Sequence, residues 1–181
     1  MIIIKCYSGG TRFVIVVGFL AFKFAKINPI TAYKFARKHF VHNHLKDVTR
    51  KYGYTTPVSP LYWLFRGIMA NWLEWRYYRR SRLPILVPTY LSLGLVNIQL
   101  AGVRPQMTEK YFRNQISAII GHDENSDHDI HADSHTLRIL DNYAAFAGRL
   151  KIVDYGSKAA WPFLDKWGQK IFDCFVIPLT K

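Results

Sequence analysis

The first 26 residues alternate short apolar runs with glycines, which is the pattern of β-strands joined by tight turns. The apolar runs are MIIIKCYS, RFVIVV and FLAFKFAK. They are separated by Gly9 and Gly10 and then by Gly18, at the spacing of successive hairpins. We therefore predict three antiparallel strands at the start of the chain, closed by Asn28 and Pro29.

Apolar residues at helical spacing predict four helices farther along the chain. The predicted helices span residues 31–51, 61–80, 108–120 and 161–175. Thr31 and Thr108 stand at the starts of two of them, where a hydroxyl can accept a hydrogen bond from an unpaired backbone N–H. The first helix carries a basic face, and the second contains a single acidic residue, Glu74, among basic and aromatic residues.

Shorter apolar segments between these helices predict further strands. Residues 87–93 and 95–100 follow one another before the third helix. Residues 137–140 and 150–153 are predicted to bracket a hairpin with Gly148 in its turn.

The composition is that of one folded domain, or one small bilobal unit, with a strong positive charge. The 181 residues are 50% hydrophobic and 15% aromatic, which supports a packed core. There are 25 Lys and Arg against 12 Asp and Glu, a formal net charge of +13, so we expect a phosphate-bearing or acidic partner. Cys6 and Cys174 form neither a disulfide framework nor a zinc ligand set, which favours a reducing, cytoplasmic location.

The apolar run from Phe13 to Phe22 is the segment most similar to a signal or membrane sequence. Its ten residues fall short of the roughly 20 that a transmembrane helix needs. Lys23 and Lys26 follow directly, and no small-residue cleavage pattern is present after the run. A second apolar stretch, residues 83–103, is broken by prolines. We therefore predict that the chain does not enter a membrane.

Asp154 follows directly after a short apolar strand in GRLKIVDYGS, residues 148–157. A carboxylate there supplies hard oxygen ligands for a divalent cation, and Gly156 allows the backbone to turn sharply. The segment resembles the metal-binding Asp-Phe-Gly motif of protein kinases and related small-molecule kinases, with tyrosine in the central place. The resemblance implies that Asn142, twelve residues earlier, corresponds to the asparagine that binds the second metal; the alternative is a turn asparagine.

The N-terminal strands extend this resemblance. FLAFKFAK is similar to the strand whose lysine contacts the α- and β-phosphates of ATP, so Lys23 is the implied phosphate ligand. Gly9 and Gly10 stand where the family has its glycine-rich phosphate loop, although the full loop pattern is absent. In the family a helix glutamate pairs with the lysine, so Glu74 is the implied partner of Lys23; the alternative is an ordinary surface charge.

The segment IHADSHTLRIL, residues 130–140, is similar to the catalytic loop of aminoglycoside-type phosphotransferases. In that alignment Asp133 is the catalytic base that receives the proton of the acceptor hydroxyl, with His135 beside it. Asn142 would then bind the metal, and the loop between Asp133 and Asn142 would be longer than in the family. The alternative is that these residues belong to a solvated polar loop.

Pattern and resemblance together predict an α+β, protein-kinase-like fold with a small antiparallel N-terminal sheet and a reduced helical C-terminal lobe. Residues 1–102 would form the first part, with a helical insertion at about residues 30–60, and residues 103–181 would form the second. The resemblance implies that ATP and magnesium bind between them, and that phosphate is transferred to an unknown acceptor.

Other functions remain as alternatives. A catalytically inactive pseudokinase would act as a basic module for an acidic protein or a nucleic acid, and residues 72–82 interleave basic and aromatic side chains as nucleic-acid-binding surfaces do. A small subunit of a larger assembly is equally compatible with the composition. A transition-metal site is the remaining alternative, formed by His122, His128, His131 and His135.

Overall fold

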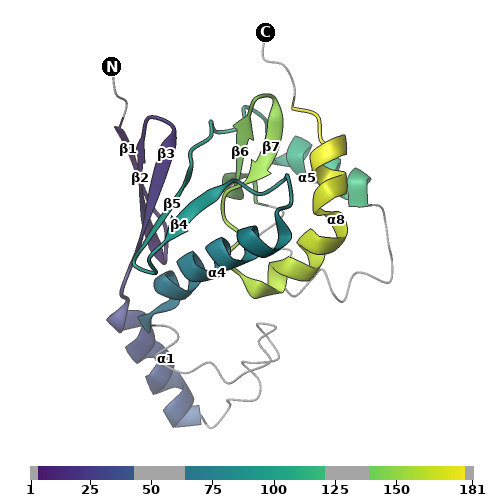
Figure 1. Cartoon of the computed structure of the whole chain (residues 1–181). Coiled ribbons are helices and arrows are strands. Elements are labelled where there is room, and N and C mark those ends of the chain that lie inside the picture. Colours follow the sequence, from purple (N-terminus) through teal and green to yellow (C-terminus); the bar gives the residue numbers. More distant parts are fainter. Residues whose placement is uncertain (1–3, 43–63, 121–138, 178–181) are drawn as a thin grey trace.

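The computed structural model describes residues 4–42, 64–120 and 139–177 (Figure 1). The fold is α+β, with an antiparallel N-terminal sheet and a helical C-terminal part, as predicted. Among the described residues, five strands form the N-terminal sheet, in the spatial order β1-β2-β3-β5-β4. These strands are β1 (Ile4–Ser8), β2 (Arg12–Val17), β3 (Leu20–Ala25), β4 (Thr89–Ser92) and β5 (Val96–Leu100).

The helices are α1 (Pro29–His42), α4 (Arg66–Ser81), α5 (Glu109–Ile120) and α8 (Trp161–Cys174). A second sheet is the hairpin of β6 (Tyr143–Phe146) and β7 (Arg149–Ile152), and two 3₁₀ turns flank it, η2 (Leu140–Asn142) and η3 (Lys158–Ala160). Figure 1 shows β1, β2 and β3 at one side of the molecule and α5 and α8 at the other, with α4 between them.

Turn residues set the register of the first three strands, which are antiparallel as predicted. Val17 pairs with Leu20 across a two-residue turn, and its first residue, Gly18, has a φ of 58°. Glycine reaches this conformation without the strain that a side chain would add. The apolar run from Phe13 to Phe22 is thus divided between β2 and β3. Within the part of the chain that the structure describes, no helix is long and apolar enough to cross a bilayer.

The face of the sheet toward α4 is polar. Directly opposite residues of antiparallel strands share a face, and the register pairs Lys23 with Asn97 and Ala21 with Gln99. All four of these residues are buried, whereas Phe24, on the other face, is exposed. Helix α4 packs against β3, β4 and β5. Buried charged and amide groups require partners, and α4 and the segment after β7 provide acceptors for the N–H donors of Lys23, Asn97 and Gln99.

The hydrophobic core lies between α5, α8, the β6–β7 hairpin and the C-terminal half of α4. Its largest fully buried side chains include Tyr77, Phe112, Ile85, Leu86, Ile116, Leu150, Ile152, Leu164 and Ile171. Backbone hydrogen bonds join the segment after α4 to β7, from Ile152 N–H to the Ile85 carbonyl (2.7 Å) and from Val87 N–H to the Ile152 carbonyl (3.0 Å). Asp154 follows β7 by two residues, so this pairing brings it to the N-terminal sheet.

Two predicted element boundaries were wrong. Asn28, rather than Thr31, caps α1, because the helix begins at Pro29 and the Asn28 Oδ1 accepts the Thr31 N–H at 3.2 Å. The first strand of the hairpin is β6 rather than residues 137–140, because the turn contains only Ala147 and Gly148, both with positive φ, and pairs Phe146 with Arg149.

The other boundaries are closer to prediction. The Thr108 hydroxyl accepts the Tyr111 N–H at 3.2 Å, so the predicted cap of α5 is confirmed. Gly148 lies in the hairpin turn, as predicted. Residues 43–51 and 61–63 of the predicted first and second helices lie outside the described residues.

Candidate functional site

The structure brings Lys23 and Glu74 into direct contact. The Lys23 Nζ donates hydrogen bonds to the Glu74 Oε1 (3.1 Å) and Oε2 (3.0 Å). Both residues are buried, Lys23 on β3 and Glu74 on the face of α4 that packs against the sheet. A buried charge is tolerated when a partner of opposite charge and further hydrogen bonds satisfy it. The carboxylate implied as the partner of Lys23 is therefore in place.

Amide and carbonyl groups complete the surroundings of this pair. The Asn97 Nδ2 donates to the Glu74 Oε2 at 2.9 Å. The Val153 carbonyl accepts hydrogen bonds from the Lys23 Nζ and, at 3.3 Å, from the Gln99 Nε2. The ammonium group thus donates hydrogen bonds both to α4 and to the residue before Asp154, and these bonds fix its position.

Asp154 reaches the same cluster through Arg12, a residue that sequence reasoning did not single out. The Arg12 Nη2 donates to the Asp154 Oδ1 at 2.5 Å, and the Arg12 Nη1 lies 2.7 Å from the Glu74 Oε1. Arg12 is buried, whereas the side chain of Asp154 is 46% exposed. We call these four residues, Arg12, Lys23, Glu74 and Asp154, the charge cluster.

Opposing effects set the pKa values in the charge cluster. Burial lowers the pKa of Lys23, and the nearby charge of Glu74 offsets this only in part, so that the pKa stays below its ordinary value. Partial burial would raise the pKa of Asp154, but the charges of Arg12 and Lys23 outweigh it and hold the pKa well below its ordinary value. The pKa of Arg12 is raised despite burial, because two carboxylates surround it. Asp154 is therefore ionised at neutral pH.

Asn142 lies across the hairpin from the residue before Asp154. It ends η2, and its carbonyl accepts the Val153 N–H at 2.8 Å. The backbone thus places Asn142 opposite Val153, the residue that precedes Asp154 in the chain.

Tyr155, in the centre of the Asp-Tyr-Gly segment, anchors it to the rest of the protein. The side chain is fully buried. Its hydroxyl donates to the Val87 carbonyl at 2.7 Å and is hydrogen-bonded to the Thr89 Oγ1 at 2.6 Å. These contacts hold the segment against the start of β4 and the residues just before it, and so limit the movement of Asp154.

Gly156 is required for a reason other than the predicted sharp turn. Its φ is not positive. A Cβ at this position would lie 2.7 Å from the Ala70 carbonyl oxygen and 3.1 Å from the Ala70 Cα. The absence of a side chain therefore lets the segment after Asp154 pass directly against the backbone of α4.

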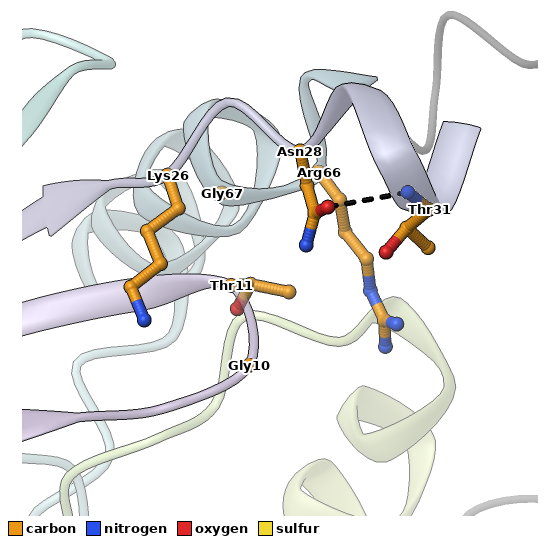
Figure 2. Close-up of a pocket in the computed structure, with 7 residues that line it drawn as sticks. All are labelled: Gly10, Thr11, Lys26, Asn28, Thr31, Arg66 and Gly67. Carbon is orange, nitrogen blue, oxygen red and sulfur yellow. Dashed lines mark hydrogen bonds between the residues drawn. The ribbon is translucent and has the colours of Figure 1, made fainter. Parts of the chain in front are cut away.

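Gly9 and Gly10 belong to the turn between β1 and β2, next to a pocket of about 210 Å³. Figure 2 shows the lining residues Gly10, Thr11, Lys26, Asn28, Thr31, Arg66 and Gly67. The Lys26 Nζ donates to the Gly9 carbonyl and to the Ser8 Oγ, each at 2.7 Å. A Cβ on Gly10 would meet no atom within 4 Å, so the fold itself does not require glycine there. No residue of the charge cluster lines this pocket.

A magnesium ion at Asp154 would compete with Arg12 for the carboxylate. The ion needs oxygen ligands at about 2.0–2.1 Å, and a guanidinium cation already binds the Asp154 carboxylate. Among residues 4–42, 64–120 and 139–177, no group of three or more His, Cys, Asp or Glu side chains could hold a metal. Asp133 and His135 lie outside the described residues, as do the other histidines of that segment.

Comparison with protein-family models, with curated proteins and with solved structures gives no match for this chain. The charge cluster itself is therefore the basis for a functional assignment.

Proposed function

We propose that the chain binds ATP through Lys23, as the kinase-like resemblance implies, and that it transfers the γ-phosphate to an acceptor hydroxyl. The observation that supports this most strongly is the buried Lys23 held by both oxygens of Glu74. In protein kinases a lysine on the third strand pairs with a helix glutamate and contacts the nucleotide phosphates. Here the lysine is also on the third strand, and the glutamate is on the helix that packs against the sheet.

The contacts of the ammonium group indicate how a phosphate would bind. Two of its hydrogen bonds go to Glu74 and one goes to the Val153 carbonyl. An anionic phosphate oxygen is a stronger acceptor than a neutral carbonyl. A phosphate oxygen would therefore replace the Val153 carbonyl and leave the bonds to Glu74 intact. Because Glu74 already fixes the lysine, little conformational entropy is lost on binding.

The residues proposed for the transfer step are known from the sequence alone, because they lie outside the described residues. The acceptor oxygen would attack the γ-phosphorus, the bond from that phosphorus to the β,γ-bridging oxygen would break, and ADP would leave. Asp133 would receive the proton of the acceptor hydroxyl, with His135 beside it. Replacement Asp133→Asn should abolish phosphate transfer and spare nucleotide binding.

A second candidate function is nucleotide binding without turnover. The observation that favours it is the ion pair between Arg12 and Asp154, because the carboxylate implied as a metal ligand already has a cation. The net charge of +13 would then serve an acidic protein or nucleic-acid partner.

A thermal-shift series separates these proposals. ATP, ADP, AMP and adenosine at equal concentration should raise the melting temperature in decreasing order, because a ligand that binds only the folded state stabilises it. ATP consumption measured in the same samples distinguishes an enzyme from an inactive binder. Equal shifts with all four compounds, or none, would rule out a phosphate site at Lys23.

A further inference from the structure

Arg12 joins three separate parts of the chain through its ion pairs. It stands at the first position of β2, its Nη1 lies 2.7 Å from Glu74 of α4, and its Nη2 donates at 2.5 Å to Asp154 after β7. Its side chain is only 7% exposed. The contact with the fully buried Glu74 is therefore an interior interaction that solvent screens weakly, whereas the contact with Asp154, whose side chain is 46% exposed, lies at the edge of the interior.

The guanidinium supplies Asp154 with a permanent positive charge. An arginine side chain does not lose its proton in a protein, and its planar fork suits carboxylates. Arg12 and Lys23 together balance the two negative charges of Glu74 and Asp154. The charge cluster is therefore neutral and complete before any ligand binds.

A divalent cation and Arg12 compete for the same carboxylate. An ion bound to Asp154 would sit close to the guanidinium that is hydrogen-bonded to that group, and the two positive charges would repel each other. Moving Arg12 away would also remove a cation from the fully buried Glu74. Such a change is unfavourable, because the buried Glu74 would keep Lys23 as its cation but lose the second one.

We propose that Arg12 takes the place of a divalent cation at Asp154, so that the chain binds its nucleotide phosphates without magnesium. This inference rests on the proposed nucleotide site and specifies how that site is charged. Arg12 acts on the phosphates by holding Asp154 neutralised and by fixing Glu74 beside Lys23. Removal of Arg12 converts the site into one that requires a metal.

Isothermal titration of ATP into the wild type, in EDTA and in magnesium, tests the proposal. The expected dissociation constants agree within about threefold. Arg12→Met should bind ATP at least about tenfold more weakly in EDTA and recover in magnesium. Arg113→Met is the matched control, because it removes the same charge from an exposed ion pair on α5 and should behave as the wild type.

The outcomes distinguish the two claims. A wild type that loses at least about tenfold in affinity in EDTA refutes the role of Arg12 and leaves the nucleotide site standing. Absence of ATP binding in both buffers refutes the nucleotide site and, with it, this inference.

Manganese binding without nucleotide, followed by electron paramagnetic resonance, is a readout that does not depend on ATP. The wild type should leave manganese free, and Arg12→Met should bind it. If Arg12→Met does not fold, the comparison of the wild type in EDTA and in magnesium still decides the proposal.

Discussion

Lys23 and Glu74 are 51 positions apart in the chain, yet the lysine Nζ is hydrogen-bonded to both carboxylate oxygens of the glutamate. The pair ties β3 to α4 in the interior of the protein, and Arg12 extends it to Asp154. This continuity makes the charge cluster both a structural link and the candidate ligand site.

Replacement Glu74→Gln should destabilise the fold by about 3–5 kcal/mol, because two buried cations would be left with one carboxylate. Urea denaturation measures the free energy of unfolding. The control is Asp141→Asn, since Asp141 forms an exposed ion pair with Arg104, and a cost of about 0.5 kcal/mol is expected there. Equal costs for the two variants would mean that the buried ion pairs contribute little.

Two glycine substitutions should differ sharply in effect. Gly156→Ala should lower the free energy of unfolding by about 1–3 kcal/mol, because its Cβ would overlap the backbone at Ala70. Gly10→Ala should change it by less than about 0.5 kcal/mol, since nothing lies near the added methyl group. Gly10→Ala also tests the implied phosphate loop, because a loss of ATP affinity in this stable variant would place the ligand against the turn. An unaffected Gly156→Ala would contradict the close packing of this segment on α4.

Acid should weaken the fold through Asp154. The pKa of this carboxyl is lower in the folded chain than its ordinary value of 3.8, so the ionised form stabilises the folded state. That contribution is complete above about pH 5 and is lost as the pH falls below the ordinary value toward the folded pKa. Asp154→Asn should therefore flatten the dependence of unfolding free energy on pH in this range. The control Asp141→Asn alters an exposed pair with Arg104 and should keep the wild-type slope. A slope unchanged in Asp154→Asn would show that the carboxyl gains nothing from Arg12.

The three N-terminal strands were predictable because glycines mark the two turns between them. Glu74 was identifiable as the single acidic residue of a basic helix. Which face of the sheet is buried was not predictable from the local sequence pattern. Alternation of apolar and polar residues favours burying Phe24 and exposing Lys23, and the structure does the reverse. The reason is non-local, since Glu74 and the Val153 carbonyl satisfy the lysine from distant parts of the chain.

Arg12 illustrates the same limit. At the start of an apolar strand, an arginine is normally a solvated end residue. Only the register of β2 with β3, and the pairing of β7 with the segment after α4, place it between two carboxylates. A usable signal was nevertheless present, because Asn97 and Gln99 alternate with apolar residues in β5, as Lys23 does in β3. Polar residues repeated at this period in neighbouring strands indicate a buried polar face.

Isothermal titration of ATP into the wild type, Lys23→Met and Lys170→Met tests whether Lys23 binds the nucleotide phosphates. Lys170 is an exposed lysine of α8 and serves as the matched control. We expect equal dissociation constants for the wild type and Lys170→Met, and binding at least about tenfold weaker for folded Lys23→Met. Failure of the folded wild type to bind ATP, or equal binding by Lys23→Met, would contradict this role of Lys23.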